Sequence, residues 1–143
     1  MRINDIITAK GTTVITARSA QRVSDLVRVL AEHRIGAVVV TDDGDMVEGI
    51  AGERDVVRAL AERGAAALDA TVGEIMDRDV HVCVPDDDIA TVAGTMTEFR
   101  CRHMPVMLDG RFVAIVSIGD IVKSRIDQLQ TEHEYLLHYV HGE

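Results

Sequence analysis

The sequence is poor in aromatic residues and in cysteine. Only 3% of its 143 residues are aromatic and none is tryptophan, so Val, Ile, Leu, Ala and Met must build the core. The two cysteines, Cys83 and Cys101, form neither a metal-type pair nor a disulfide framework. No stretch reaches the roughly 18 apolar residues of a membrane span, and residues 1–5 lack the apolar run of a signal peptide. These absences predict a soluble, cytoplasmic protein.

Positive charge is also scarce, with 15 Lys and Arg against 24 Asp and Glu and a formal net charge of −9. Nucleic acids and anionic membranes need a basic face. Arg100, Arg102 and His103 make only a small patch, with no aromatic residues to stack on bases. We therefore expect neither nucleic acid nor membrane as a partner. A small anionic ligand held by a few local cations remains compatible with this charge.

What the sequence does contain is an internal repeat, the feature that sets an architecture. Residues 23–30 align with residues 89–96 at an offset of 66, and apolar residues match at positions i, i+3, i+4 and i+7. This spacing predicts a helix with one buried face in each copy. The same offset aligns two strand-forming segments, residues 38–40 and 104–106.

An Asp-Gly pair follows the strand segment in both copies, at residues 43–44 and 109–110. Because glycine tolerates a positive φ, this pair predicts a tight hairpin turn. After the turn the offset becomes 65, so that Asp55 aligns with Asp120. One extra residue near Glu48 in the first copy accounts for the change.

Each copy therefore predicts the order strand, helix, strand, tight turn, strand, helix, which is an α/β (α+β) fold. We place the first copy in residues 1–63, a linker in residues 64–71 and the second copy in residues 72–126. Because the linker is short, the copies should pack as a pseudo-twofold pair with equivalent clefts at their seam. Residues 127–143 form an additional helical segment.

This C-terminal segment predicts a long helix with an apolar stripe. The stripe alternates steps of four and three residues, which is the spacing of a heptad seam with one polar break. We expect the stripe to build a homodimer contact, and the alternative is a helix that folds back over its own chain. The stripe contains Val122, Ile126, Leu129, His133, Leu136 and Val140.

The repeated motifs resemble the CBS (cystathionine-beta-synthase) motif over about residues 3–126. The first copy carries Gly49-Ile50 and Glu53-Arg54-Asp55, and the second carries Arg102-His103-Met104-Pro105-Val106 and Ser117-Ile118-Gly119-Asp120. The chain is similar to stand-alone bacterial CBS-pair proteins, or Bateman modules. The resemblance implies two clefts for adenosine-containing ligands, with AMP or NAD(H) leading, and a dimer.

No motif for catalysis accompanies this pattern, because the chain has no Gly-x-Ser-x-Gly and no Walker loop. We expect a regulatory, ligand-sensing module and not an enzyme, with no catalytic cofactor. Its output would pass through a dimer or through a separate protein partner. Two alternatives stay open: a metal- or thiol-dependent protein using Cys101 and His103, and an interaction scaffold with empty clefts.

The start of the second copy's last helix suits a nucleotide. Unpaired N–H groups at a helix start attract phosphate, and a carboxylate accepts ribose hydroxyls. The resemblance assigns Ser117 to phosphate and Asp120 and Asp55 to ribose. Ser-x-x-Asp is also a structural capping box, and both roles can hold together. Gly52 stands where the family prefers Ser or Thr, so the first cleft loses a phosphate contact for which Arg54 can compensate.

Other positions of the motif border the expected ligand. Arg102 and His103 would reach phosphates or simply begin an exposed strand. Gly36 and Ala37 would let adenine lie against the backbone, although Gly36 also fits a helix C-cap. Lys10 is a further phosphate candidate or a solvated lysine. The complete predicted ligand site is Lys10, Gly36, Ala37, Gly52, Glu53, Arg54, Asp55, Arg102, His103, Met104, Pro105, Ser117, Gly119 and Asp120.

Overall fold

The first half of the chain builds a three-stranded sheet with two long helices. The structure is a computed structural model that describes residues 1–11 and 13–141. The strand order is β1-β2-β3, with β1 parallel and β3 antiparallel to β2. The elements are β1 (Thr16–Ala17), α2 (Val23–His33), β2 (Ala37–Val40), β3 (Gly49–Gly52) and α3 (Glu53–Arg63).

The second half repeats this plan with a two-stranded antiparallel sheet. The expected first strand of this copy is reduced to an isolated bridge between Cys83 and Val106. The predicted tight turn is confirmed, because Asp109 and Gly110 have φ values of 53° and 78° and join strands paired up to Leu108 and Arg111. The elements are α5 (Ile89–Phe99), β4 (His103–Leu108), β5 (Arg111–Ser117) and α6 (Ile118–Val140).

The first copy does not make the predicted tight turn. Strand β2 ends at Val40 and β3 begins only at Gly49. The Asp43 carboxylate accepts the N–H groups of Asp45 and Met46, both at 2.8 Å, so the chain after Asp43 is held in a longer loop. Asp43 therefore organises a loop, whereas its counterpart Asp109 lies in a two-residue turn.

The two repeated helices bury most of the face that their spacing predicts, but Val27 at the i+4 position of α2 is exposed. Helix α2 buries Val23, Leu26 and Leu30, and α5 buries residues at the same repeat positions. Each helix ends at a left-handed arginine, Arg34 at φ 53° and Arg100 at φ 54°. The helix C-cap is therefore Arg34, so the C-cap alternative for Gly36 is wrong.

The two halves are interlocked through the short helix at the start of each copy. These helices are α1 (Ile3–Lys10) and α4 (Val72–Ile75), the latter following the short 3-10 helix η1 (Gly64–Asp69). Ile3 of α1 is fully buried in the core of the second half, and Val72 of α4 is fully buried in the core of the first half. Each half therefore completes its core with the first helix of the other copy.

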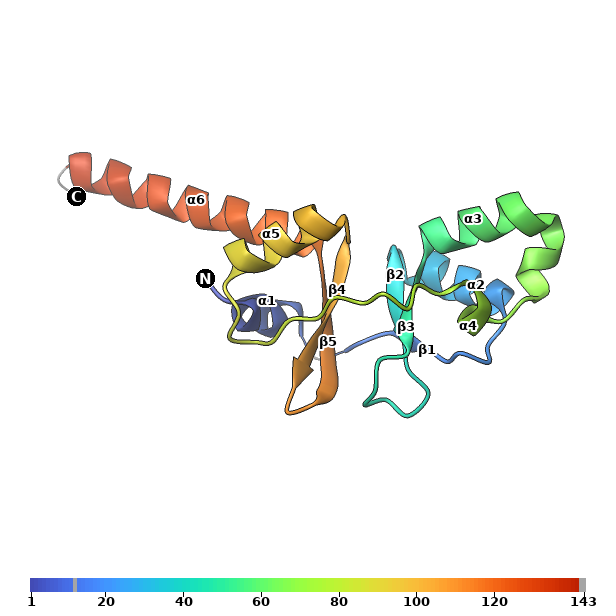
Figure 1. Ribbon diagram of the computed structural model, residues 1–143. Helices are drawn as coiled ribbons and strands as arrows, with labels where there is room; N and C mark the ends of the chain where they lie inside the picture. Colours follow the sequence, from blue (N-terminus) through green and yellow to red (C-terminus); the bar gives the residue numbers. More distant parts are fainter. Residues whose placement is uncertain (12, 142–143) are drawn as a thin grey trace.

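The sheets meet at the centre of the molecule, and the helices lie outside them (Figure 1). Helix α6 runs away from this body, and every residue from 129 to 141 is exposed. The alternative in which this helix folds back over its own chain is therefore wrong. Residues 142–143 of the predicted extension lie outside the described part. Within the described residues, no helix is long and apolar enough to cross a membrane.

Candidate functional site

Two clefts open at the seam between the halves. The first, cleft 1, has a volume of about 430 Å³ and contains Asp55. The second, cleft 2, has a volume of about 400 Å³ and contains Asp120. Gly36, Ala37, His103 and Ser117 line both clefts. These four residues form the wall through which one cleft contacts the other.

The repeat relates the walls of the two clefts. Cleft 2 is lined by residues 13–15 and 34–37, and the offset of 66 converts these into residues 79–81 and 100–103 of cleft 1. The offset of 65 likewise converts Asp55 into Asp120. The clefts are therefore equivalent under the internal symmetry, as the repeat predicts.

Both acidic residues sit at the third position of a helix and cap it. The Asp55 Oδ2 atom accepts the Gly52 N–H at 2.9 Å, and the Asp120 Oδ2 atom accepts the Ser117 N–H at 2.9 Å. The Ser117 Oγ atom accepts the Asp120 N–H at 3.1 Å, which confirms the capping box. The capping role fixes where each carboxylate points, and it leaves the second oxygen for another contact, which in Asp55 is the Arg58 guanidinium at 3.5 Å.

A backbone hydrogen bond ties each helix start to the start of the neighbouring strand in the same half. The Glu53 N–H donates to the Gly36 carbonyl at 3.0 Å, and the Ile118 N–H donates to the Arg102 carbonyl at 2.8 Å. These two bonds occupy matching positions in the repeat. They hold both helix starts against the strand starts that form the wall shared by the two clefts.

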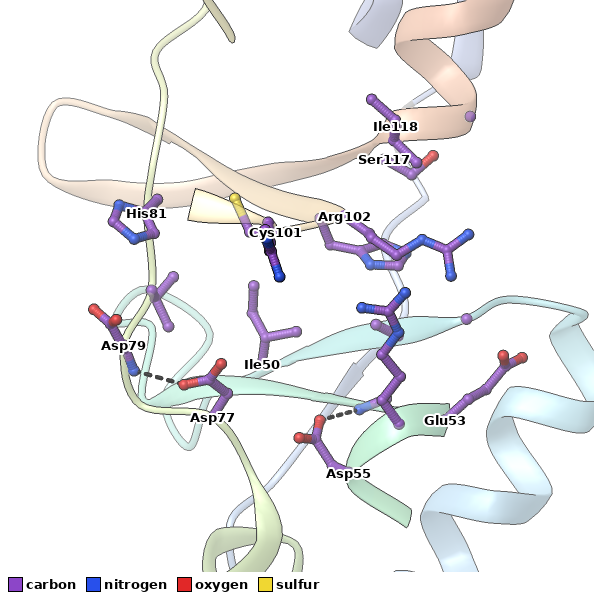
Figure 2. A pocket seen from close by; sticks show the side chains of 18 of the residues that line it. Ile50, Glu53, Asp55, Asp77, Asp79, His81, Cys101, Arg102, Ser117 and Ile118 are labelled. Carbon is purple, nitrogen blue, oxygen red and sulfur yellow. Dashed lines mark hydrogen bonds between the residues drawn. The ribbon is translucent and has the colours of Figure 1, made fainter. Parts of the chain in front are cut away.

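Cleft 1 has an acidic end and a basic end (Figure 2). Asp77, Asp79 and His81 lie at one end, and Arg102 lies near Ser117 at the other. His81 stacks on Phe99, with ring centroids 4.0 Å apart. From the sequence, His81 was a candidate for the metal alternative or for the cleft wall, whereas the two acids and two further lining arginines were not part of the predicted ligand site. The additional lining residues are Arg58, Arg100, Asp77, Asp79 and His81.

In cleft 2 a lysine already holds the equivalent carboxylate. The Lys10 Nζ atom donates to Asp120 Oδ2 at 2.8 Å and to the Ile115 carbonyl at 3.1 Å. Lys10 lies in the last turn of α1, so the segment that completes the core of the second half also supplies this cation. The structure thus brings Lys10 into the predicted site beside the ribose candidate.

The two carboxyl groups have opposite pKa shifts. Burial raises the pKa of Asp55, and the nearby Asp77 carboxylate raises it further. The hydrogen bond from the Gly52 N–H and the charge of Arg58 lower this pKa, but they do not outweigh burial. Burial also acts to raise the pKa of Asp120, but the hydrogen bonds from Lys10 and Ser117 outweigh it and hold that pKa below its ordinary value.

Gly52 lies against the opposite strand so closely that no side chain fits. A Cβ atom at this position would lie 2.6 Å from the Gly36 carbonyl oxygen and 2.9 Å from the Ala37 Cβ atom. The backbone of Gly52 has φ −147°, which any residue adopts, so crowding and not conformation requires glycine. This contact explains why the first copy departs from the Ser or Thr that the motif prefers.

Two of the predicted site residues lie in the core. Met104 and Pro105 are almost fully buried and line neither cleft. Glu53, Arg54 and Gly119 line cleft 1, beside Asp55. Burial lowers the pKa of His103, which Arg102 and Lys10 lower further while Asp120 and Glu53 oppose them.

The metal or thiol alternative gains little from the geometry. Two residues two apart in a strand would point to the same face, but strand β4 begins at His103, so Cys101 precedes the strand. Burial raises the pKa of Cys101, and burial also raises the pKa of Cys83 to about 12, which disfavours thiolate. Throughout residues 1–11 and 13–141, no group of three His, Cys, Asp or Glu side chains is placed to hold a metal ion.

The chain is similar in sequence and fold to known proteins. A family model for the CBS domain matches residues 4–62 and 72–127. The chain belongs to the CBS domain family. A CBS-domain containing protein from Agrobacterium tumefaciens has 39% sequence identity to this chain. Its crystal structure superposes with a TM-score of 0.84 and covers 87% of this chain and 99% of that one. The mitochondrial CBS domain-containing protein CBSX3 of Arabidopsis thaliana is 29% identical over 98% of this chain and 72% of its own length.

A third CBS pair was solved with ligands. The CBS domain pair of protein MJ0100 is 27% identical with a TM-score of 0.79, and the superposition covers 90% of this chain and 98% of that one. Its structure is a complex with 5-methylthioadenosine and S-adenosyl-L-methionine. The fold and the tandem repeat predicted from the sequence are thereby confirmed.

Proposed function

We propose that this CBS pair is a regulatory module that binds adenosine nucleotides, with AMP, ATP and NAD(H) as the leading ligands. The observation that carries the proposal is the pair of equivalent clefts, each with a carboxylate at the third position of a helix start. A carboxylate at this point suits ribose hydroxyls, although at Asp55 they would share Oδ1 with the Arg58 guanidinium, which lies 3.5 Å away. The volumes, about 430 and 400 Å³, lie within the usual range for small-molecule sites.

The MJ0100 complex supports an adenosine-containing ligand, because both molecules in that complex contain adenosine. Adenosine alone would leave the arginines at the basic end of cleft 1 without a partner. Phosphate groups would bind these guanidinium groups through charge-assisted hydrogen bonds. A nucleotide therefore uses more of cleft 1 than a nucleoside does.

Ligand binding would be transmitted through the shared wall. The ligand in either cleft would contact Gly36, Ala37, His103 or Ser117, which also border the other cleft. A change in the spacing of the two halves would then reach α6, because Ser117 is the N-cap of that helix. A dimer or a separate regulated protein would respond to α6.

Calorimetry tests the proposal with AMP, ATP, NAD, NADH and S-adenosylmethionine at concentrations up to millimolar. We expect binding of at least one of these, and mass spectrometry of denatured protein should identify a co-purified nucleotide. Asp55→Ala and Asp120→Ala should each remove one binding event, with an affinity loss of about ten- to a hundredfold at that cleft. Asp127→Ala, an exposed change on α6, is the matched control.

The same experiment separates the sensor from its alternatives. If none of the five ligands binds and mass spectrometry detects no co-purified nucleotide, the nucleotide-sensor hypothesis is rejected and the ligand-free scaffold remains. Two unchanged binding events in both Asp variants would reject the ribose assignment. Stoichiometric metal in purified protein would favour the metal-dependent alternative.

A further inference from the structure

The clefts are equivalent in shape but differ in their free positive charge. The repeat aligns Arg102 with Gly36 and Arg54 with Gly119. Both arginines line cleft 1, whereas cleft 2 is lined by Gly36 and by neither arginine. This difference lies in the side chains of this chain and not in the shared motif.

The arginines of cleft 1 are available to a ligand. Among the described residues, Arg54, Arg100 and Arg102 take part in no ion pair, whereas Arg58 contacts Asp55 at 3.5 Å. In cleft 2 the Lys10 ammonium already contacts Asp120 at 2.8 Å. Arg34 is then the remaining guanidinium of cleft 2, and it matches Arg100 of cleft 1. The surplus in cleft 1 is therefore Arg54 and Arg102.

The charges of cleft 1 are arranged in a fixed order along it (Figure 2). Asp79 and His81 lie at one end, Asp55 lies below the middle, and Arg102 lies at the other end beside Ser117. The start of α6 at this end adds the partial positive charge of a helix N-terminus. Glu53 also lines the cleft and is exposed, as Arg54 and Arg102 are, so its single negative charge offsets only one of the two guanidinium charges.

This order matches the order of base, ribose and phosphates in a nucleotide. With the ribose on Asp55, a base would lie toward the stacked ring of His81, and its phosphates would extend toward the arginines. Each added phosphate brings more negative charge to guanidinium groups that lack a partner in the protein. In cleft 2 the same ligand would place its added phosphates near Gly36, the repeat counterpart of Arg102.

We propose that cleft 1 selects nucleotides with two or more phosphates through Arg54 and Arg102, whereas cleft 2 binds an adenosine ligand with little regard to phosphate number. This inference rests on the proposed function and assigns a ligand class to each cleft. The module would then compare a polyphosphorylated nucleotide with a less phosphorylated one in the same molecule.

Calorimetry with adenosine, AMP, ADP and ATP in magnesium-free buffer tests the assignment on two single-cleft variants. In Asp120→Ala, which retains cleft 1, ATP should bind at least about tenfold more tightly than AMP. In Asp55→Ala, which retains cleft 2, the two affinities should agree within about threefold. Raising the salt concentration should weaken ATP binding to cleft 1 more than AMP binding.

The arginines are tested in the otherwise unchanged chain, so that the result does not depend on the Asp variants folding. Arg54→Gln combined with Arg102→Gln should abolish the tenfold ATP preference while adenosine still binds. Arg28→Gln, an exposed change on α2 outside both clefts, should retain the preference. An equal ATP-to-AMP ratio in both clefts, or an ATP preference that survives the double change, would overturn the assignment and leave nucleotide binding intact. Silence for every nucleotide would overturn both proposals.

Discussion

At the scale of single residues, the same carboxylate has a different neighbour in each half. Asp120 is held by the Lys10 ammonium, whereas Asp55 is near the Asp77 carboxylate. The repeat places both acids at the same point of a helix start. The segment that arrives from the other half decides their charge environment, and it differs between the clefts.

The opposite pKa shifts predict that the clefts lose ligand at different pH. A carboxylate must be ionised to accept both ribose hydroxyls, and the raised pKa of Asp55 means that it protonates first as the pH falls. The lowered pKa of Asp120 keeps it ionised to a lower pH. Calorimetry of the two single-cleft variants between pH 7 and about pH 4 should show cleft 1 weakening at the higher pH.

A ligand without a ribose, inorganic triphosphate, is the control for this profile, since its binding to the arginines does not require an ionised Asp55. Loss of ribose ligands from cleft 2 at the higher pH would contradict the assignment of these two carboxylates.

The close approach of strands β2 and β3 at Gly52 leaves no room for a side chain at this position. Serine at this position would place its Cβ atom 2.6 Å from the Gly36 carbonyl oxygen. We expect Gly52→Ser to lower the free energy of unfolding by about 1–3 kcal/mol, because the strand start must move away. Urea unfolding measures this change, and calorimetry should show weaker binding in cleft 1.

Gly119→Ser is the matched control, because the nearest atom to a Cβ there is Ser117 Oγ at 3.5 Å, an ordinary contact. Equal losses of stability in the two variants would show that the close approach at Gly52 does not limit the site.

At the scale of helices and strands, the sequence predicted elements whose pattern is local. The apolar spacing of α2 and α5 and the Asp109-Gly110 turn depend on neighbouring residues, and all three are present. The matching turn at Asp43-Gly44 failed because the Asp43 side chain bonds its own loop, which the residue pair does not reveal. The expected strand near Cys83 is reduced to one bridge.

The candidate site divides in the same way. Asp55, Asp120 and Ser117 lie at repeated helix starts, so an alignment of the two copies finds them. Asp77 and His81 come from an extended segment with no apolar period, and only the fold places them in cleft 1. The alignment of residues 34–37 with 100–103 would have revealed Arg100 as a lining residue.

Helix α6 packs on the body through its first turns, where Ile121 and Ser124 are buried, but residues 129–141 are exposed throughout. Its stripe residues are exposed, with 49% of Leu129 and 61% of Leu136 accessible. Isolated helical segments shorter than about 12–15 residues are marginal in water, so a helix of this length beyond the body needs a cover. We propose that the stripe packs against a second copy of the chain, as the heptad spacing predicts.

Removal of residues 128–143 should lower the mass measured by light scattering, or loosen the dimer on dilution. Leu136→Glu within the stripe should have the same effect, because it places a charge in an apolar contact. Gln130→Glu, which lies off the stripe, is the control. A truncated chain that remains a tight dimer would show that the repeats alone form the interface.

At the scale of the whole molecule, the two halves cannot be separated at the linker. Ile3 and Ile6 of α1 pack in the core of the second half, while Val72 and Met76 pack in the core of the first. A cut between the copies would therefore leave each half without part of its own core. The exchange also joins the core to the ligand site, because the helix that carries Ile3 ends at Lys10, which holds Asp120.

This arrangement predicts a specific consequence of a change far from either cleft. Ile3→Ala should lower the free energy of unfolding by about 2–5 kcal/mol, because Ile3 is fully buried and its loss leaves a cavity. Urea unfolding should remain a single transition, since each half contributes a helix to the core of the other. Calorimetry should show weaker binding in cleft 2 than in cleft 1, because α1 positions Lys10 beside Asp120. Met46→Ala, which removes a side chain that is 64% exposed, should change neither quantity. Equal effects of the two substitutions, or a loss confined to cleft 1, would show that α1 does not connect the second core to its cleft.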